Sequence, residues 1–454
     1  MRSIFAAVLL LVSLGSLAES KVHEALLANG LKVLVKEDHR APIVVSQVWY
    51  KVGSSYEPDG ITGVSHVLEH MMFKGTEKYA PGKFSRIISA NGGEDNAFTG
   101  RDYTTYYQKL AKDRLEVAFE LEADRMRNLT LPTDEFVKEL EVVKEERRLR
   151  TEDKPTSLTY EQFNALAYRA LPYANPVIGW MNDLDHLEVA DLHAWYRRWY
   201  APNNATLVVV GDVDHEQVML LAKRYFGDLK PEKIPQLKPL REPPQLGEVR
   251  AVVRTPAKEP YLIMGYKTPV LTTAKEAWEP YALDMLAAVL DGGSSARFSR
   301  NLIRGREIAV SAGASYSPFS RLSGMLSLSG TPAKGHTMDE LEQGLKNEIE
   351  LVKRELVADQ ELARVRARVV AEQVYELDSV FYQAMQIGIL ETVGLDWRLL
   401  DEYVEQLKQV TPEQVREVAR KYLVDDHLTV TWLEPLPMKK SQRKPVQTLG
   451  GHHG

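Results

Sequence analysis

Cysteine is absent from the 454-residue sequence. Disulfide bridges, thiolate metal sites and cysteine nucleophiles are therefore excluded, and any metal ion must be held by histidine and carboxylate side chains. Beyond the first twenty residues, no apolar run approaches the ~20 residues that a membrane-spanning helix needs, so we expect no integral membrane segment in the mature chain. A basic excess is also missing. The formal net charge is −6, which argues against nucleic acid as a partner.

Residues 1–18 have the composition of a cleavable secretory signal peptide. A basic residue, Arg2, precedes an apolar run from Ile4 to Leu14, and the small residues Ser16 and Ala18 are typical of a cleavage site. We therefore expect an exported protein, periplasmic or secreted. At the other end, residues 437–454 contain "KKSQRK" and "GGHHG" and are expected to form a flexible tail.

Five prolines between residues 231 and 248 predict a linker between two domains, at 22–230 and 249–436. Near their ends the two halves align without a gap when Tyr200 is placed on Tyr422, and each aligned segment predicts a helix, a polar turn and a strand. Both halves begin with β-rich runs, and long helical patterns follow, such as residues 362–390. We therefore predict an α+β fold of two homologous domains, each a mostly antiparallel sheet packed with helices.

The segment "GVSHVLEHMMFKGT", residues 63–76, carries two histidines and a glutamate on an apolar helix. Thr62 is a candidate helix cap. At about 100° per residue, His66 and His70 lie about 40° apart and Glu69 lies about 60° from His66 on the other side, so the three side chains can address one point. Two imidazoles one turn apart suit zinc, and a neighbouring glutamate suits the base that activates a water. The order His-x-x-Glu-His is itself a recognised peptidase motif.

A third ligand can be sought on the acidic helix predicted over residues 133–150. Glu139 and Glu146 lie two turns apart on one side of that helix, and Glu145 faces about 100° away from Glu146. Helical spacing alone leaves Glu145 and Glu146 as rivals.

The segments "HVLEHMMFKGT", "NGGEDNAFTGRDYTTYY" and "EVVKEERR" together resemble the pitrilysin/insulinase family of zinc peptidases, the inverzincins. The resemblance is nearest to half-size members, such as the catalytic subunit of mitochondrial processing peptidase and bacterial periplasmic homologues. It implies one Zn²⁺ per chain held by His66, His70 and Glu146, because the family's spacing from the second histidine falls on Glu146. Glu139 then corresponds to the family's second acidic residue, seven residues before the ligand, which supports the metal site and the reacting water.

The same resemblance implies a peptide-binding strand beside the metal. Asn96, Ala97, Phe98 and Thr99 match the family's edge strand, whose backbone pairs with an extended substrate. Without the family, this stretch is a Gly-rich turn that enters a strand. The segment "NPVIGW" at residues 175–180 also matches the family's sequence after the ligand helix.

One departure from the family pattern concerns the second half of the chain. Members active as a single polypeptide type carry an Arg and a Tyr seven residues apart, which contact the substrate and its oxyanion. Here Arg304 supplies the first, but Ser311 stands seven residues on, Val310 aligns best with the Tyr, and Tyr316 is twelve away. We therefore expect a dimer, and specifically a heterodimer in which a homologous chain supplies the Arg/Tyr pair.

These observations predict a zinc-dependent metalloendopeptidase that hydrolyses unfolded peptides or small polypeptides. Zinc would activate the water and Glu69 would take its proton. Two alternatives stay open: a non-catalytic scaffold or partner subunit of the same fold, and another zinc amide hydrolase. A scaffold has no need of the full set of His66, Glu69, His70 and Glu146, and a different hydrolase would be expected to lack the strand at residues 96–99 and the second-half repeat.

Overall fold

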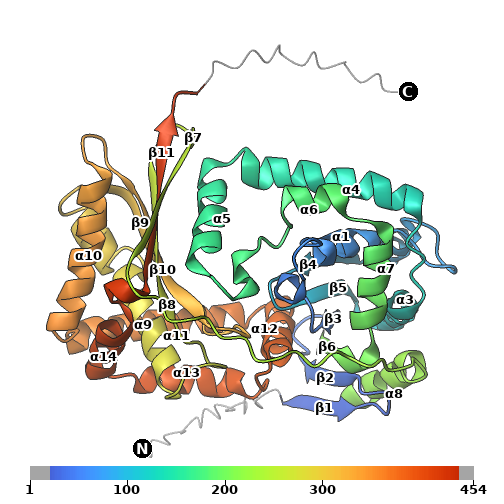
Figure 1. Ribbon diagram of the computed structural model, residues 1–454. Helices are drawn as coiled ribbons and strands as arrows, with labels where there is room; N and C mark the ends of the chain where they lie inside the picture. Colours follow the sequence, from blue (N-terminus) through green and yellow to red (C-terminus); the bar gives the residue numbers. More distant parts are fainter. Residues whose placement is uncertain (1–20, 439–454) are drawn as a thin grey trace, which may run out of the picture.

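The computed structural model describes residues 21–438 and is drawn in Figure 1. The signal peptide expected at residues 1–18 lies outside the described residues, as does nearly all of the tail expected at 437–454. Within the described part of the chain, none of the helices has the length and apolar character needed to cross a membrane.

The first half of the chain forms a six-stranded sheet. Its order is β1-β2-β6-β3-β5-β4, and every neighbouring pair is antiparallel except β2 with β6. The strands are β1 (Val22–Leu26), β2 (Lys32–Glu37), β3 (Ile43–Tyr50), β4 (Glu94–Thr99), β5 (Thr104–Ala111) and β6 (Ala205–Gly211). Strand β6 is buried along its whole length, which agrees with its continuous apolar sequence.

The second half forms a five-stranded sheet with the order β7-β11-β8-β10-β9. Here β7 and β11 are the parallel pair, and the other pairs are antiparallel. The strands are β7 (Val249–Pro256), β8 (Tyr261–Thr268), β9 (Ala309–Ser315), β10 (Gly324–Pro332) and β11 (Leu428–Leu436). This order repeats β2-β6-β3-β5-β4 strand for strand, so the two halves share one topology, and the predicted α+β fold class is confirmed.

Fourteen α-helices lie within the described residues. They are α1 (Val64–Met71), α2 (Lys83–Ala90), α3 (Leu115–Arg127), α4 (Thr133–Arg147), α5 (Pro155–Ala167), α6 (Met181–His186), α7 (Val189–Trp199), α8 (His215–Phe226), α9 (Glu279–Asp291), α10 (Met338–Arg354), α11 (Asp359–Glu376), α12 (Val380–Val393), α13 (Leu399–Gln409) and α14 (Pro412–Tyr422). The helical pattern over residues 362–390 is not one helix. It breaks between α11 and α12, where the Ser379 hydroxyl accepts a hydrogen bond from the backbone N–H of Tyr382 and starts α12.

The ends of the two halves match as their sequences predict. Helix α7, a 3₁₀ turn at Pro202–Asn204 and β6 correspond to α14, a 3₁₀ turn at Asp425–His427 and β11. The aligned tyrosines, Tyr200 and Tyr422, both lie where the helix gives way to the turn.

Each half also lends one helix to the sheet of the other. Helix α5, from the first half, packs against β7, β8 and β11, and Phe163 is buried with Ile263 of β8. Helix α12, from the second half, packs against β3 and β6, and Ile387 is buried with Trp49 of β3. In Figure 1, α5 lies beside the second sheet and α12 lies between the two sheets. The exchange ties the halves together through two apolar contacts.

Candidate metal centre

Helix α1 carries the two histidines and is anchored by its apolar face. Val64, Val67, Leu68 and Met71 are buried in the core of the first half. His66, Glu69 and His70 are only partly buried and lie on the helix face turned away from that core. The N-cap residue is Gly63, with φ 89°, so the helix starts at Val64. A cap at Thr62 would have started it one residue earlier.

The role predicted for Thr62 as a helix cap is therefore wrong. Its hydroxyl donates to Asp183 Oδ2 at 2.6 Å, so it fastens the chain near residues 175–183. Glu57 instead satisfies the start of the helix, because its carboxylate accepts hydrogen bonds from the backbone N–H groups of Gly63 (2.7 Å) and Ser65 (2.8 Å). A carboxylate at a helix N-terminus satisfies free N–H groups and complements the helix dipole.

The structure brings His66, His70 and Glu146 together although Glu146 comes from α4. Their ligand atoms all lie within 4.8 Å of one another. Glu146 Oε2 is 3.9 Å from His66 Nε2 and 3.5 Å from His70 Nε2. Two ligands of a tetrahedral zinc ion, at their usual bond lengths, stand about 3.4 Å apart. The three side chains are thus spaced as a zinc site requires.

The surroundings of the two histidines also suit a cation. His70 Nδ1 lies 3.2 Å from Glu139 Oε2, so a neutral His70 that donates there turns the lone pair of Nε2 toward Glu146. A lone pair that faces a carboxylate oxygen is repelled unless a cation lies between them. Burial, reinforced by the positive charge of Arg150, lowers the pKa of His66 to about 3, which keeps this imidazole neutral and able to bind metal.

Glu69 lies beside the ligands without being one of them. Its carboxylate Oε2 accepts a 2.5 Å hydrogen bond from Thr99 Oγ1 of β4, which fixes its direction. Burial raises the pKa of Glu69, and the Thr99 hydrogen bond partly opposes this shift. A carboxylate whose proton affinity is raised in a cleft suits a general base.

Two cations hold the acidic side chains in place. Lys74 Nζ lies 2.5 Å from Glu139 Oε1, opposite the oxygen that meets His70. Arg150 Nη1 lies 2.6 Å from Glu146 Oε1. Glu145, the rival of Glu146, is 60% exposed and pairs with Arg148 at 3.1 Å. The geometry therefore favours Glu146 over Glu145 as the ligand.

A cavity of about 1290 Å³ opens beside the three ligands. All four residues expected on the peptide-binding strand, Asn96 to Thr99, line it, and they belong to β4, one of the two edge strands of the first sheet. Along β4 the side chains alternate. Thr99 turns to Glu69 on α1, whereas the Phe98 ring packs edge-on against Trp49 at 5.7 Å. Phe98 therefore supports the strand through the sheet, while Thr99 faces the metal centre.

The segment at residues 175–180 closes one side of the same cavity. Asn175, Pro176, Val177 and Ile178 line it. The chain here touches the start of α1, because a Cβ placed on Gly63 would lie 2.6 Å from the Ile178 carbonyl oxygen. Glycine at residue 63 is thus required both by its positive φ and by this contact.

Arg304 is not brought to the cavity. It is exposed, and its guanidinium donates to the backbone carbonyl oxygens of Ser294 and Ser299. Tyr316 is not brought there either, since its hydroxyl donates to the Pro269 carbonyl oxygen at 2.7 Å and its ring packs on the core of the second half. Among the described residues of the second half, Tyr261 of β8 lines the cavity.

Several residues of the centre are not among the predicted site residues. Arg150 follows Glu146 by one helical turn, which is the spacing of an ion pair on a helix, although residues 148–152 form a π-helical turn. Lys74 lies just beyond the end of α1 and pairs with Glu139 of α4, a contact that no spacing along the chain predicts. Tyr160 and Asn164 on α5 also line the cavity, and only the tertiary packing of α5 places them there.

Comparison with known proteins agrees with this architecture. A model of the insulinase family, peptidase family M16, matches residues 32–180, and a model described as the peptidase M16 inactive domain matches residues 186–369. Zinc protease PqqE of Helicobacter pylori is 31% identical over 437 residues, with 94% of this chain and 97% of that protein covered. The chain belongs to the insulinase family, M16. Its half-size relatives include zinc proteases.

Other relatives extend the comparison. The uncharacterized zinc protease YmxG of Bacillus subtilis is 25% identical, with coverage of 88% of this chain and 95% of that protein. The crystal structure of a protease from Helicobacter pylori superposes with a TM-score of 0.86 at 30% identity and covers 92% of this chain and 100% of its own. An M16 inactive domain from Pseudomonas fluorescens, at 18% identity and a TM-score of 0.82, covers 92% of this chain and 99% of its own and has the same fold. The family resemblance inferred from the sequence is thereby confirmed.

Proposed function

We propose that this chain is a zinc metalloendopeptidase that cleaves unfolded peptides or small polypeptides. The observation that carries the proposal is the complete set of His66, Glu69, His70 and Glu146 on one cavity whose wall is an edge strand. A zinc ion held by the two histidines and Glu146 would acidify a water molecule and polarise a scissile carbonyl group. The zinc protease relatives support this metal.

The chain's own residues supply the proton transfers and the substrate register. Glu69, oriented by Thr99, takes the proton of the attacking water and later gives it to the leaving amine. Because β4 has β5 as its neighbour on one side and ends the sheet order, its other edge can pair with an extended peptide. Only an unfolded segment can adopt that conformation, which supports unfolded peptides as substrates.

A zinc-retaining variant tests the proposal. In Glu69→Gln the ligands stay, so we expect one bound zinc per chain and a loss of cleavage of about 10²–10⁴-fold on an unstructured, fluorescence-quenched peptide. Glu94→Gln is the matched control, because Glu94 starts the same strand, is exposed and pairs with Lys109 at 3.4 Å; it should cleave like the parent. Cleavage by Glu69→Gln at the parent rate would refute the peptidase assignment. If the parent cleaves no peptide, either alone or with a homologous partner chain, the alternative of a non-catalytic scaffold would be favoured.

The proposal includes a partner chain. Arg304 and Tyr316 are engaged elsewhere in the second half, and this supports a dimer, specifically a heterodimer in which a homologous chain supplies an Arg/Tyr pair to this cavity. We expect the purified chain alone to cleave peptides slowly and a co-expressed half-size homologue that carries the pair to raise kcat. Full activity of the isolated chain as a monomer, measured by light scattering and kinetics together, would exclude this part of the proposal.

We also propose that the protein is exported and acts in the periplasm or outside the cell. The signal-like composition of residues 1–18 supports this location. Fractionation of cells that express the full chain, with N-terminal sequencing of the mature protein, tests it; a cytoplasmic chain that still carries Arg2 would count against export.

A further inference from the structure

A second group of metal-binding side chains lies at the other edge of the first sheet. Within residues 21–438, two groups of three His or Glu side chains bring a ligand atom each to within 4.8 Å of one another. One is the zinc centre described above, beside β4. The other is His23, Glu37 and His215, at the β1 end of the same sheet. The peptidase chemistry makes no use of it.

The register of the sheet brings these three residues together. His23 on β1 is paired with Val35 on β2, and paired residues of antiparallel strands share a face. Glu37 stands two residues beyond Val35 and so lies on that face as well. Strand β2 runs parallel to β6, and the chain leaving β6 reaches His215, the first residue of α8. All three side chains are therefore attached to strands or to the first turn of a helix.

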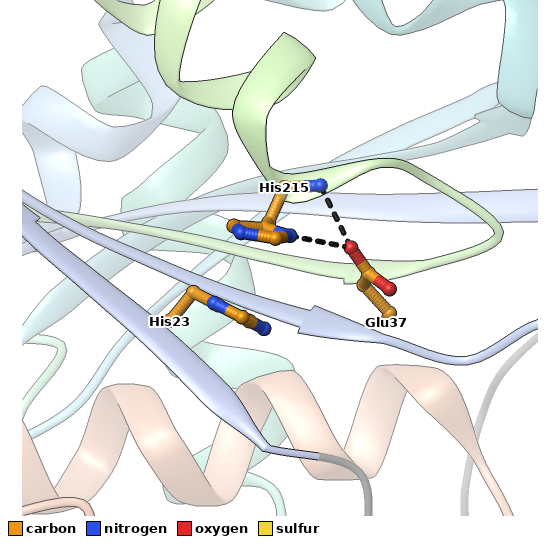
Figure 2. A group of neighbouring side chains, drawn as sticks. All are labelled: His23, Glu37 and His215. Atoms are coloured by element: carbon orange, nitrogen blue, oxygen red, sulfur yellow. Dashed lines mark hydrogen bonds and ion pairs between the residues drawn. The ribbon is translucent and has the colours of Figure 1, made fainter.

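The side chains already contact one another. Glu37 Oε1 lies 2.7 Å from His215 Nδ1 and accepts a 2.9 Å hydrogen bond from the His215 backbone N–H. The His23 ring stacks on the His215 ring, with a centroid distance of 3.5 Å and an interplanar angle of 20°. In Figure 2 the two rings lie one above the other, with the Glu37 carboxylate beside them. Glu37 and His215 are 29% and 32% exposed, so an ion can reach them from solvent.

We propose that His23, Glu37 and His215 form a second metal site, separate from the catalytic centre, that binds zinc or a similar first-row divalent ion. Two imidazoles with one carboxylate make the donor set that zinc takes in proteins, with a fourth position left for water. Calcium and magnesium prefer all-oxygen sites. The proposal does not depend on the peptidase assignment.

Binding requires a small change at His23. In the stacked arrangement the nitrogen lone pairs of the two rings run nearly parallel, so they do not converge on one ion. A turn of the His23 ring about its Cβ–Cγ bond would tilt its lone pairs out of this parallel arrangement and toward a shared ion, and such terminal torsions have broad, shallow preferences. The Glu37 and His215 ligand atoms, now 2.7 Å apart, would separate to about 3.4 Å around the ion.

The carboxylate of Glu37 is already held from its other side. Glu37 Oε2 lies 3.4 Å from His39 Nε2, and His39 Nδ1 lies 2.7 Å from Asp212 Oδ1. A carboxylate fixed by a histidine that is itself fixed by a second carboxylate is oriented before the metal arrives. His39 is thus a positioning residue in this site. An ion here would fasten β1, an edge strand, to β2 and α8 and so stabilise the folded chain.

Metal counting in the full-length chain tests the proposal. All versions carry His452→Gln and His453→Gln, so that imidazoles of the C-terminal "GGHHG" contribute no zinc. After equilibrium dialysis against zinc, the parent should hold about two zinc ions per chain and His70→Asn about one. His23→Phe removes a ligand but keeps an aromatic ring on His215, so it should also hold about one. His193→Phe, on α7, is the control for loss of a histidine and should hold about two.

Thermal unfolding separates a lost site from a damaged fold. His23→Phe should melt at the parent temperature without metal, because the stacking is kept. Zinc should raise the melting temperature of His70→Asn but not of the double variant His23→Phe/His70→Asn, whereas calcium should shift neither. Two zinc ions in His23→Phe, one zinc ion in the parent, or an equal zinc response of the single and double variants would overturn the second site. None of these results alters the outcome expected for Glu69→Gln.

Discussion

Glu139 is expected to control zinc affinity although it is not a ligand. Its carboxylate lies 3.2 Å from His70 Nδ1 and 2.5 Å from Lys74 Nζ. Glu139→Gln removes the charge that holds the proton on Nδ1, so Nε2 becomes a weaker and less well directed ligand, and it leaves Lys74 without its nearest counter-charge. Loss of such a supporting partner lowers metal affinity about 10–100-fold, or about 1.4–2.7 kcal/mol.

The assay is a zinc titration of metal-free protein in competition with a chromophoric chelator. Glu145→Gln is the matched control, since Glu145 is on the same helix but is 60% exposed and pairs with Arg148; its zinc affinity should equal that of the parent. The melting temperatures of both metal-free variants report whether the fold survives. Parent-like affinity in Glu139→Gln, or an equal loss in Glu145→Gln, would refute the assignment of Glu139 as the support of His70.

Two further predictions concern stability. Burial raises the pKa of Asp284 to about 6 from its ordinary value of 3.8, so the folded state binds more protons between these values and stability falls as pH rises through that window. Asp284→Asn should therefore stabilise the protein at pH 8 by on the order of 2 kcal/mol. This is less than the roughly 3 kcal/mol that ~1.4 kcal/mol per pKa unit would give for the whole rise, because the side chain is only partly buried. The substitution should have little effect at pH 3.5; urea unfolding at both pH values checks this, and equal effects at both would contradict it. A Cβ on Gly388 of α12 would lie 2.1 Å from Trp49 Cε2, so Gly388→Ala should cost roughly 1–3 kcal/mol, although alanine is the better helix former by about 1 kcal/mol; an unchanged urea midpoint would show that α12 can shift without cost.

The duplicated fold was open to prediction because its signals are local. A helix, a polar turn and a strand follow one another at the end of each half, and the gapless alignment of Tyr200 with Tyr422 needed no knowledge of distant contacts. The exchange of α5 and α12 between the sheets could not be predicted in this way. Periodicity reports which face of a helix is apolar, but it does not say which sheet that face packs against. The contact of Phe163 with Ile263 is therefore known only from the tertiary structure.

The metal centres show the same division between local and long-range information. His66, Glu69 and His70 lie on one helix, so their spacing fixes their common direction. Glu145 and Glu146 differ by about 100° on α4, and the choice between them depends on how α4 lies against α1, which family spacing supplied and periodicity did not. The ligands of the second site come from β1, β2 and α8 and share no motif. Only strand register unites them, so a site built across a sheet stays hidden until pairing is known.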